Sequence, residues 1–365
     1  MTGSPRGTSG EGAASATALH QVRPEWLALH AEPAIDPALP IIDAHHHLWD
    51  VGGDAYLLDD YLADLRRGHD VIASIYVQSG TMMLRDGPEA LRPVGETRFA
   101  ASVAARCETE GGWPRVATAI VGPFDLSLGT RAGAVLEAHA EAAGGRLRGV
   151  RALTHWHEDR AIHRIATTAG MLLTPSASEA IAAVERSGLV LDIWVYHTQL
   201  DEVIAVARAF PDLVIVLDHA GTPLGIGCFA GRRDEVLAAW RARMRVLAQL
   251  PNVFVKLGGL AMRFSGHDFG HRPMPPSSEM LAEAWRPEIE TCIDLFGAGR
   301  CMFESNFPVD KASCAYGVLW NAFKRLCVDA SQEERSRLFA GTAAAVYRIP
   351  LQGGGPAGAR SGGCG

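Results

Sequence analysis

The sequence predicts an α/β protein folded as a single (β/α)8 TIM barrel. Short runs rich in Val and Ile alternate with longer amphipathic stretches, which is the pattern of parallel strands and their crossover helices. Eight such units can be counted along the chain, and a barrel of this kind needs roughly 250 residues plus loops. A doubly wound open sheet is the alternative, but three histidines follow the first strand where that fold carries a glycine fingerprint.

The expected strands lie near residues 40, 70, 115, 147, 189, 213, 252 and 301. Helices are expected between them, because apolar residues there recur at three- and four-residue spacings. Long loops follow the second, fourth and seventh strands, at the end of the barrel where active sites lie. The expected helical segments are 97–111, 131–143, 177–188, 199–210, 233–250 and 283–297.

Length and composition restrict the class of protein. The 365 residues fit one large barrel or about two ordinary domains. Lys and Arg total 34 against 41 Asp and Glu, a balance that disfavours a nucleic-acid partner. The seven cysteines form no CxxC pair and no apolar leader or membrane span is visible, so a reducing cytoplasm is expected, with no membrane partner. A homo-oligomer is left open.

The two ends of the chain differ from its middle. Both are rich in Gly, Ser and Ala and poor in the apolar side chains that would offset the entropy of ordering them. We therefore expect a flexible N-terminal extension over residues 1–37, a barrel over 38–347 and a flexible Gly-rich tail over 348–365.

The strongest local signal is the run of three histidines that ends the first strand. Side chains alternate along a strand, so His45 and His47 should share one face. Two imidazoles aimed at one point can ligate a metal or polarise a carbonyl group. The alternative is a polar strand end whose histidines find local partners.

Two more histidines end later strands. His219 follows a run of aliphatic residues, where packing alone explains an imidazole poorly. His197 ends the preceding strand in the same way, although its facing direction depends on where that strand stops. The carboxyl ends of all strands meet at one mouth of a barrel, so these rings should converge with those of the first strand.

Three polar side chains, those of Gln78, Arg151 and Lys256, interrupt otherwise apolar strands. Burying an unpaired charge is costly, so we expect these groups to meet either an anionic substrate or an internal partner. The candidate internal partners are Asp43, Asp192 and Asp218.

Two pairs in loops allow opposite interpretations. His155 and His157 repeat the HxH spacing after the fourth strand, and they form either a second wall of the pocket or part of an exposed loop. Asp310 and Lys311 follow the last strand and can be read as a solvated pair.

Four segments together resemble a known family. IDAHHHLWD, LDHAGTP, NVFVKLGGL and RCMFESNFPVD occur in this order, and they are similar to motifs of the amidohydrolase-related (amidohydrolase 2) family of barrel hydrolases, lactonase branch. The likeness spans about residues 38–347. It implies a hydrolase that opens a small lactone or related cyclic ester, carboxylate-bearing or sugar-derived, with or without one divalent metal, zinc being the expected ion.

The resemblance also implies roles for particular residues. His45, His47 and His219 match the family histidines, whereas Asn306 stands where the family usually has an aspartate. An amide is a weak base. Glu304, two residues earlier and on the same strand face, stands where the family commonly has a small residue.

This departure defines the site hypothesis. Glu304 accepts the proton or ligates the metal, while Asn306 positions water or a substrate oxygen. A bound metal would be held by His45, His47, His197 and Glu304, and Gln78, Arg151, His155, His157 and Lys256 are the candidate substrate contacts. Two alternatives remain, a metal-dependent decarboxylase of a small aromatic acid and a barrel that binds a small acid without catalysis.

Overall fold

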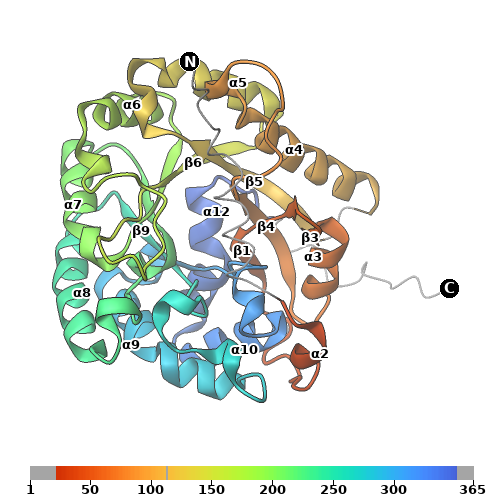
Figure 1. Cartoon of the computed structure of the whole chain (residues 1–365). Helices are drawn as coiled ribbons and strands as arrows, with labels where there is room; N and C mark the ends of the chain where they lie inside the picture. The colour runs from red at the N-terminus through yellow and green to blue at the C-terminus, as the bar shows by residue number, and fades with distance from the viewer. Residues whose placement is uncertain (1–21, 112–113, 352–365) are drawn as a thin grey trace, which may run out of the picture.

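Eight parallel strands form one sheet in the computed structural model, which describes residues 22–111 and 114–351. Each strand pairs with the next in chain order, so the predicted (β/α)8 barrel is confirmed (Figure 1). All eight expected strands are present. They are β1 (Ile41–His46), β4 (Val71–Val77), β5 (Arg115–Phe124), β6 (Leu147–Leu153), β7 (Val190–Trp194), β8 (Ile215–Leu217), β9 (Val253–Leu257) and β10 (Cys301–Phe303).

The barrel closes between β1 and the residues that follow β10. His46 and Phe307 form a parallel bridge. The backbone N–H of His47 donates to the carbonyl of Phe307 at 2.7 Å, and the N–H of Asn306 donates to that of His45 at 2.8 Å. The HxH segment and the segment after β10 are therefore fixed against each other by the backbone.

A ring of helices surrounds the strands (Figure 1). Six of these helices match the predicted segments. The helices α3, α10, α11 and α12 were not predicted. The bounds are α3 (Leu58–Leu65), α4 (Val94–Thr109), α5 (Ala132–Ala142), α6 (Pro175–Arg186), α7 (Leu200–Ala209), α8 (Arg233–Ala248), α9 (Ser278–Phe296), α10 (Tyr316–Leu326), α11 (Gln332–Ser336) and α12 (Thr342–Val346).

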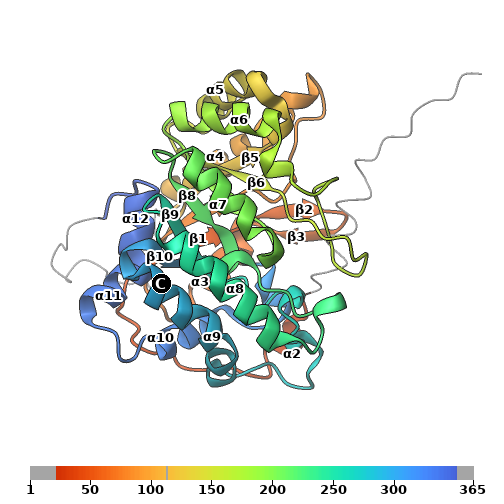
Figure 2. The ribbon, with the colours of Figure 1, turned by 90° about the vertical axis from the view of Figure 1, so that its left-hand side faces the viewer.

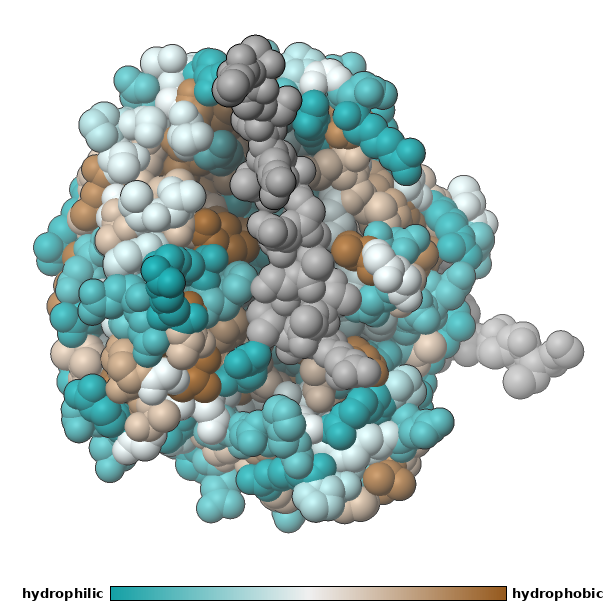
Figure 3. Space-filling model, in the orientation of Figure 1, coloured by the Kyte–Doolittle hydropathy of each residue, from teal (hydrophilic) through white to brown (hydrophobic). Residues whose placement is uncertain are grey.

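The two ends of the barrel are covered differently. A hairpin of β2 (Trp49–Val51) and β3 (Asp54–Tyr56) follows β1, while α12 lies at the opposite end (Figure 2). The three-residue strands of the hairpin are too short to leave a periodic pattern in the sequence. On the face shown in Figure 3, hydrophobic residues form small separate patches among hydrophilic ones.

Residues 22–37, which the sequence analysis assigns to the N-terminal extension, pack against the barrel. Trp26 and Leu27 of the short helix α2 (Pro24–Leu27) are buried. The Glu32 carboxylate accepts hydrogen bonds from the Ser278 backbone N–H at 2.7 Å and from Asn321 Nδ2 at 3.0 Å. At the other end of the chain, Ile349 is buried. The remaining parts of both predicted extensions, residues 1–21 and 352–365, lie outside the described residues.

None of the helices in the described part of the chain has the length and apolar character needed to cross a membrane.

The anchoring of residues 22–37 predicts acid-sensitive stability. Burial raises the pKa of Glu32, but hydrogen bonds from Ser278 outweigh it and lower the pKa to about 2. A folded-state pKa below the unfolded value stabilises the protein above about pH 4.5, and this contribution is lost as the pH falls toward 2. Glu32→Gln should cost about 2 kcal/mol at pH 7, measured by urea unfolding.

The control for this prediction is Glu25→Gln, which removes the same charge from an exposed residue of the same segment. Its unfolding free energy should match that of the wild type. The difference between Glu32→Gln and wild type should shrink as the pH is lowered from 6 to 3, and a difference independent of pH would contradict the argument.

Candidate active site

The carboxyl ends of the strands bring together the side chains that the sequence singles out. His45 and His47 come from β1 and the residue after it, Arg151 from β6, His219 from the turn after β8 and Glu304 from the residue after β10. Each is at most 4% exposed. Segments separated by most of the chain therefore form one buried polar cluster.

Two glycines after β9 make room for this cluster. His219 adopts φ 54°, a left-handed conformation that turns the chain sharply after β8. A Cβ at Gly259 would overlap the His219 ring, and a Cβ at Gly258 would overlap Glu304. The Gly-Gly pair that follows Lys256 and Leu257 is thus required by the close approach of the site.

Glu304 lies between two imidazoles. Its Oε1 accepts a hydrogen bond from His219 Nδ1 at 2.6 Å, and its Oε2 lies 2.8 Å from His45 Nδ1. Burial alone would raise the pKa of Glu304, but the interactions with His219 and His45 lower it to about 2. Glu304 is therefore an anion at neutral pH and a weak base, and the hydrogen bond from His219 Nδ1 places the lone pair of the neutral form of that ring on Nε2.

Both ring nitrogens of His45 face cationic donors. Arg151 Nη1 is 3.2 Å from Nε2, and Lys256 Nζ is 3.3 Å from Nδ1. Burial, with Lys256 nearby, lowers the pKa of His45 to about 4, so the ring is neutral. A neutral imidazole accepts at one nitrogen and donates at the other. The acceptor for its proton is either Glu304 or His47, whose Nε2 is 3.1 Å from His45 Nε2.

The tautomer of His47 follows from its second contact. His47 Nδ1 lies 2.8 Å from the carbonyl oxygen of Val77, which can only accept a hydrogen bond. The proton of the neutral ring is therefore on Nδ1, and Nε2 carries the lone pair. This lone pair is directed toward His45.

A buried ion cluster lies beside the histidines. Lys256 Nζ is 2.6 Å from Asp192 Oδ2 and 3.2 Å from Asp218 Oδ1, and Arg151 Nη1 is 3.4 Å from Asp218 Oδ2. Burial lowers the pKa of Lys256, but the two aspartates outweigh it and hold the pKa above its usual range. Of the two interpretations left open for Arg151 and Lys256, the structure shows the internal salt bridge.

Asp43 is not a partner of these cations. Its carboxylate accepts hydrogen bonds from Ser305 N and Oγ at 2.8 and 2.6 Å, from Tyr61 at 2.8 Å and from Tyr316 at 3.0 Å. Asp43 therefore fixes the segment after β10, on which Glu304 and Asn306 lie.

The cluster fits a divalent cation. His45, His219 and Glu304 each offer one ligand atom, and these atoms lie within 4.8 Å of one another. Glu304 Oε2 is fully buried and lies 2.8 Å from His45 Nδ1, so a carboxylate oxygen and an imidazole nitrogen meet within this group. Two cations and three carboxylates meet beside the imidazoles, so these five charged groups leave one negative charge. Nitrogen and carboxylate oxygen are suitable ligands for zinc.

The remaining predicted residues are spread around the site. The His197 ring packs against Phe229 and its Nδ1 accepts a hydrogen bond from Leu224 N at 3.3 Å, so it lies outside the group of possible metal ligands. His155 is buried and contacts the Trp194 ring, with 3.9 Å between ring centroids. His157 is partly exposed.

Gln78 and Asn306 are both buried at the carboxyl ends of their strands. The backbone carbonyl of Gln78 accepts a hydrogen bond from Arg151 Nη2. Asn306 Nδ2 donates to Asp310 Oδ1 at 2.9 Å. The reading of Asp310 and Lys311 as a solvated pair is wrong, because Asp310 is 1% exposed and Lys311 pairs with Asp64 at 2.6 Å.

Trp194 is a site residue that the sequence analysis missed. It ends β7, is partly exposed, and its ring lies 5.6 Å from that of His219 and 5.9 Å from the Arg151 guanidinium. The available signal was its spacing of two from Asp192, which places both side chains on the inner face of the strand.

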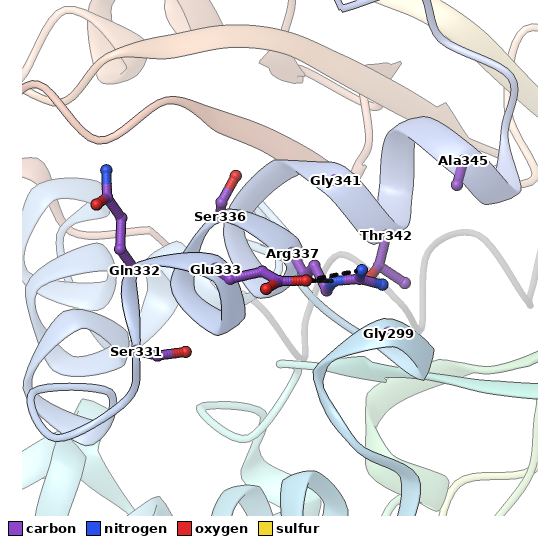
Figure 4. Close-up of a pocket in the computed structure, with 9 residues that line it drawn as sticks. All are labelled: Gly299, Ser331, Gln332, Glu333, Ser336, Arg337, Gly341, Thr342 and Ala345. Carbon is purple, nitrogen blue, oxygen red and sulfur yellow. Dashed lines mark hydrogen bonds and ion pairs between the residues drawn. The ribbon is translucent and has the colours of Figure 1, made fainter.

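Two cavities lie outside this cluster. One of about 780 Å³ is lined by Gly299, which precedes β10, and by α11 and its neighbours, at the opposite end of the barrel (Figure 4). The other, of about 750 Å³, is lined by Ala261, Met262 and Val309 among others. Only the second is next to the site, since these residues follow β9 and β10.

A (β/α)8 barrel with histidines and a carboxylate converging at its carboxyl end defines the class of barrel hydrolases. The chain matches the amidohydrolase family model over residues 42–349 and belongs to that family. An L-fucono-1,5-lactonase of Burkholderia multivorans is 32% identical over 323 residues, covering 85% of this chain and 96% of the relative.

Two solved structures have a similar fold. An amidohydrolase from Burkholderia multivorans with bound zinc has 29% identity and a TM-score of 0.65, over 85% of this chain and 99% of the other. A putative 2-pyrone-4,6-dicarboxylic acid hydrolase from Pseudomonas putida has 20% identity and a TM-score of 0.57, over 86% and 99%. The second likeness shows the fold alone.

The ion cluster gives a prediction about stability. Lys256→Met should destabilise the protein by about 3–5 kcal/mol, because it leaves the buried carboxylate of Asp192 without its cation and that of Asp218 with Arg151 alone. Chemical denaturation measures the change. The matched control is Lys311→Met, which removes a partly exposed partner of Asp64. Equal losses for the two variants would contradict the prediction.

Proposed function

We propose that this protein is a hydrolase that opens a lactone or related cyclic ester by attack of water on the carbonyl carbon. The observation that carries the proposal is the convergence of His45, His47 and His219 with Glu304 in one buried cluster. Similarity to L-fucono-1,5-lactonases supports the reaction class. A small-molecule lactone is the proposed partner. The cysteines in the described part of the chain are free thiols, which supports a location in the reducing cytoplasm.

The carbonyl oxygen of the lactone is polarised by groups that meet beside the end of the first strand. Arg151 supplies a fixed positive charge beside His45, and His45 is within reach of His47. Donors held rigidly in a buried site stabilise the oxyanion that forms during acyl transfer. Arg151 cannot move away, because Asp218 and the Gln78 carbonyl hold it.

Water is activated by the His219–Glu304 pair. Glu304 accepts the Nδ1 proton of His219 and so presents the Nε2 lone pair as a base, which is the logic of a carboxylate–histidine pair. Glu304 itself, with its lowered pKa, stabilises the protonated ring. Asn306, two residues away, positions the water or a substrate oxygen.

A divalent metal fits the same cluster, held by His45, His219 and Glu304, with His47 adjacent. When bound, such an ion lowers the pKa of a coordinated water and polarises a carbonyl group. The structure of the relative with bound zinc supports zinc as the ion.

The first experiment measures the metal content of the purified protein together with hydrolysis of a panel of sugar lactones and aromatic-pathway lactones. Ring opening without carbon loss supports the proposal, and release of carbon dioxide would identify a decarboxylase. Ligand-induced stabilisation without any turnover would identify a binding protein.

Comparing Glu304→Gln with Asn306→Asp tests the assignment of the carboxylate. Glu304→Gln should reduce kcat by about 100-fold or more, because the amide neither fixes the His219 tautomer nor balances its charge. Thermal unfolding and metal content are measured in parallel, so that lost turnover is not lost folding. Full turnover of a folded Glu304→Gln variant would eliminate the assignment.

Trp194 is proposed to form the wall against which the ring of the substrate lies. Its partly exposed indole is held by a hydrogen bond from Nε1 to Thr222 Oγ1 at 3.0 Å. Trp194→Ala should raise KM about fivefold and change kcat little, since stacking contributes about 1 kcal/mol. Trp194→Phe, which retains an aromatic face, is the control and should retain most of the affinity. An unchanged KM in the alanine variant would rule the wall out.

A further inference from the structure

Asn306 and Asp310 hold each other through two hydrogen bonds of opposite direction. Asn306 Nδ2 donates to Asp310 Oδ1 at 2.9 Å, and the backbone N–H of Asp310 donates to the carbonyl of Asn306 at 3.1 Å. Both side chains are 1% exposed. The pair is therefore a closed clamp across the loop that leaves β10.

The second oxygen of Asp310 ties the clamp to the neighbouring strand. Asp310 Oδ2 accepts a hydrogen bond from the backbone N–H of Ala261 at 3.2 Å. Ala261 lies two residues after Gly259, which is in close contact with His219. The described contacts of the Asp310 carboxylate are thus neutral amide donors, and they join the loops of β9 and β10 next to the histidine cluster.

The clamp determines which end of the Asn306 amide is available. Nδ2 donates to Asp310 Oδ1, so exchanging the amide oxygen and nitrogen would remove this hydrogen bond and place the Asn306 oxygen against the carboxyl oxygen of Asp310. Asn306 Oδ1 has no hydrogen-bond partner among the described residues. The backbone of Asn306 is also fixed, at φ 54° and by donation to the carbonyl of His45.

We infer that Asp310 is a positioning residue that holds the Asn306 amide with its oxygen as the acceptor for the attacking water or a substrate hydroxyl. The inference rests on the proposed hydrolysis. It explains how a site with an amide in place of the family aspartate keeps a fixed acceptor at that position. Asp310 acts through Asn306 and does not touch the reacting atoms.

The test is a cycle of three variants, Asp310→Asn, Asn306→Asp and the exchange that combines both, assayed on a lactone that the wild type opens. Asp310→Asn should lower kcat about 10- to 100-fold, the usual effect of losing a partner that orients an active group. KM should change less than about threefold. Asn306→Asp should also lower kcat, because two carboxylates then face each other.

The exchange variant shows whether Asp310 orients the side chain of residue 306 or only supports the fold of the loop. It restores an amide–carboxylate hydrogen bond with its direction reversed, so an acceptor oxygen again faces the site. We expect kcat to recover to within about tenfold of the wild type, far above the value that adding the single losses gives. Asp64→Asn, which removes the partner of Lys311, is the control. It should lower the melting temperature without changing kcat.

The outcomes are distinct. Wild-type kcat in a folded Asp310→Asn variant overturns the inference while the proposed function stands. A low kcat that the exchange does not restore means that Asp310 only supports the loop, which also overturns it. If the wild type opens no lactone, the proposed function fails and the inference fails with it. Should Asp310→Asn not fold, the exchange variant alone decides, since it keeps the hydrogen bond.

Discussion

The site depends on how the barrel closes. Strand β1 meets the segment after β10 through backbone hydrogen bonds at His45 and His47, and through the carboxylate of Asp43, which binds Ser305 and two tyrosines. Asp43 precedes the HxH pair by two residues and Ser305 lies between Glu304 and Asn306. One buried carboxylate therefore sets the distance between the histidines and the carboxyl and amide groups that work with them. Burial raises the pKa of Asp43, and its hydrogen bonds from Ser305 and Tyr61 act in the opposite direction. These bonds explain why a buried carboxyl group is tolerated at this position.

The charged groups beside the histidines do not balance one another. Lys256 and Arg151 offset Asp192 and Asp218, and Glu304 then remains as an additional negative charge. Neutral imidazoles cannot cancel this charge, and removing an uncompensated anion from water costs several kcal/mol. The cluster is thus suited to gain either a proton, on His219 as it acts as base, or a divalent cation. The same electrostatics support both forms of the proposed chemistry.

The sequence predicts the barrel well because eight strands and most crossover helices leave periodic patterns. It also predicts that His45, His47, His219 and Glu304 lie together, as they do in the structure, since the carboxyl ends of parallel strands must meet. It leaves open whether Lys256 and Arg151 meet a substrate or internal aspartates, and it does not reveal the direction of His197 or the burial of Asp310. These depend on which side chains face one another across strands distant in sequence. Trp194 was missed for a related reason, because an aromatic residue at the end of an apolar strand is indistinguishable from core.

Glu304 and Asn306, at which the sequence differs from the motif it resembles, are linked by their positions and by charge. Glu304 fits only because Gly258 leaves room for its side chain, and it places a carboxylate between two imidazoles. Asp310 is a second buried carboxylate, 2.9 Å from residue 306, and burial raises its pKa to about 7. A third carboxylate at residue 306 would face Asp310 directly and lie two residues from Glu304. An amide at that position donates to Asp310 and carries no charge, so Asn306 follows from the presence of the two acids around it.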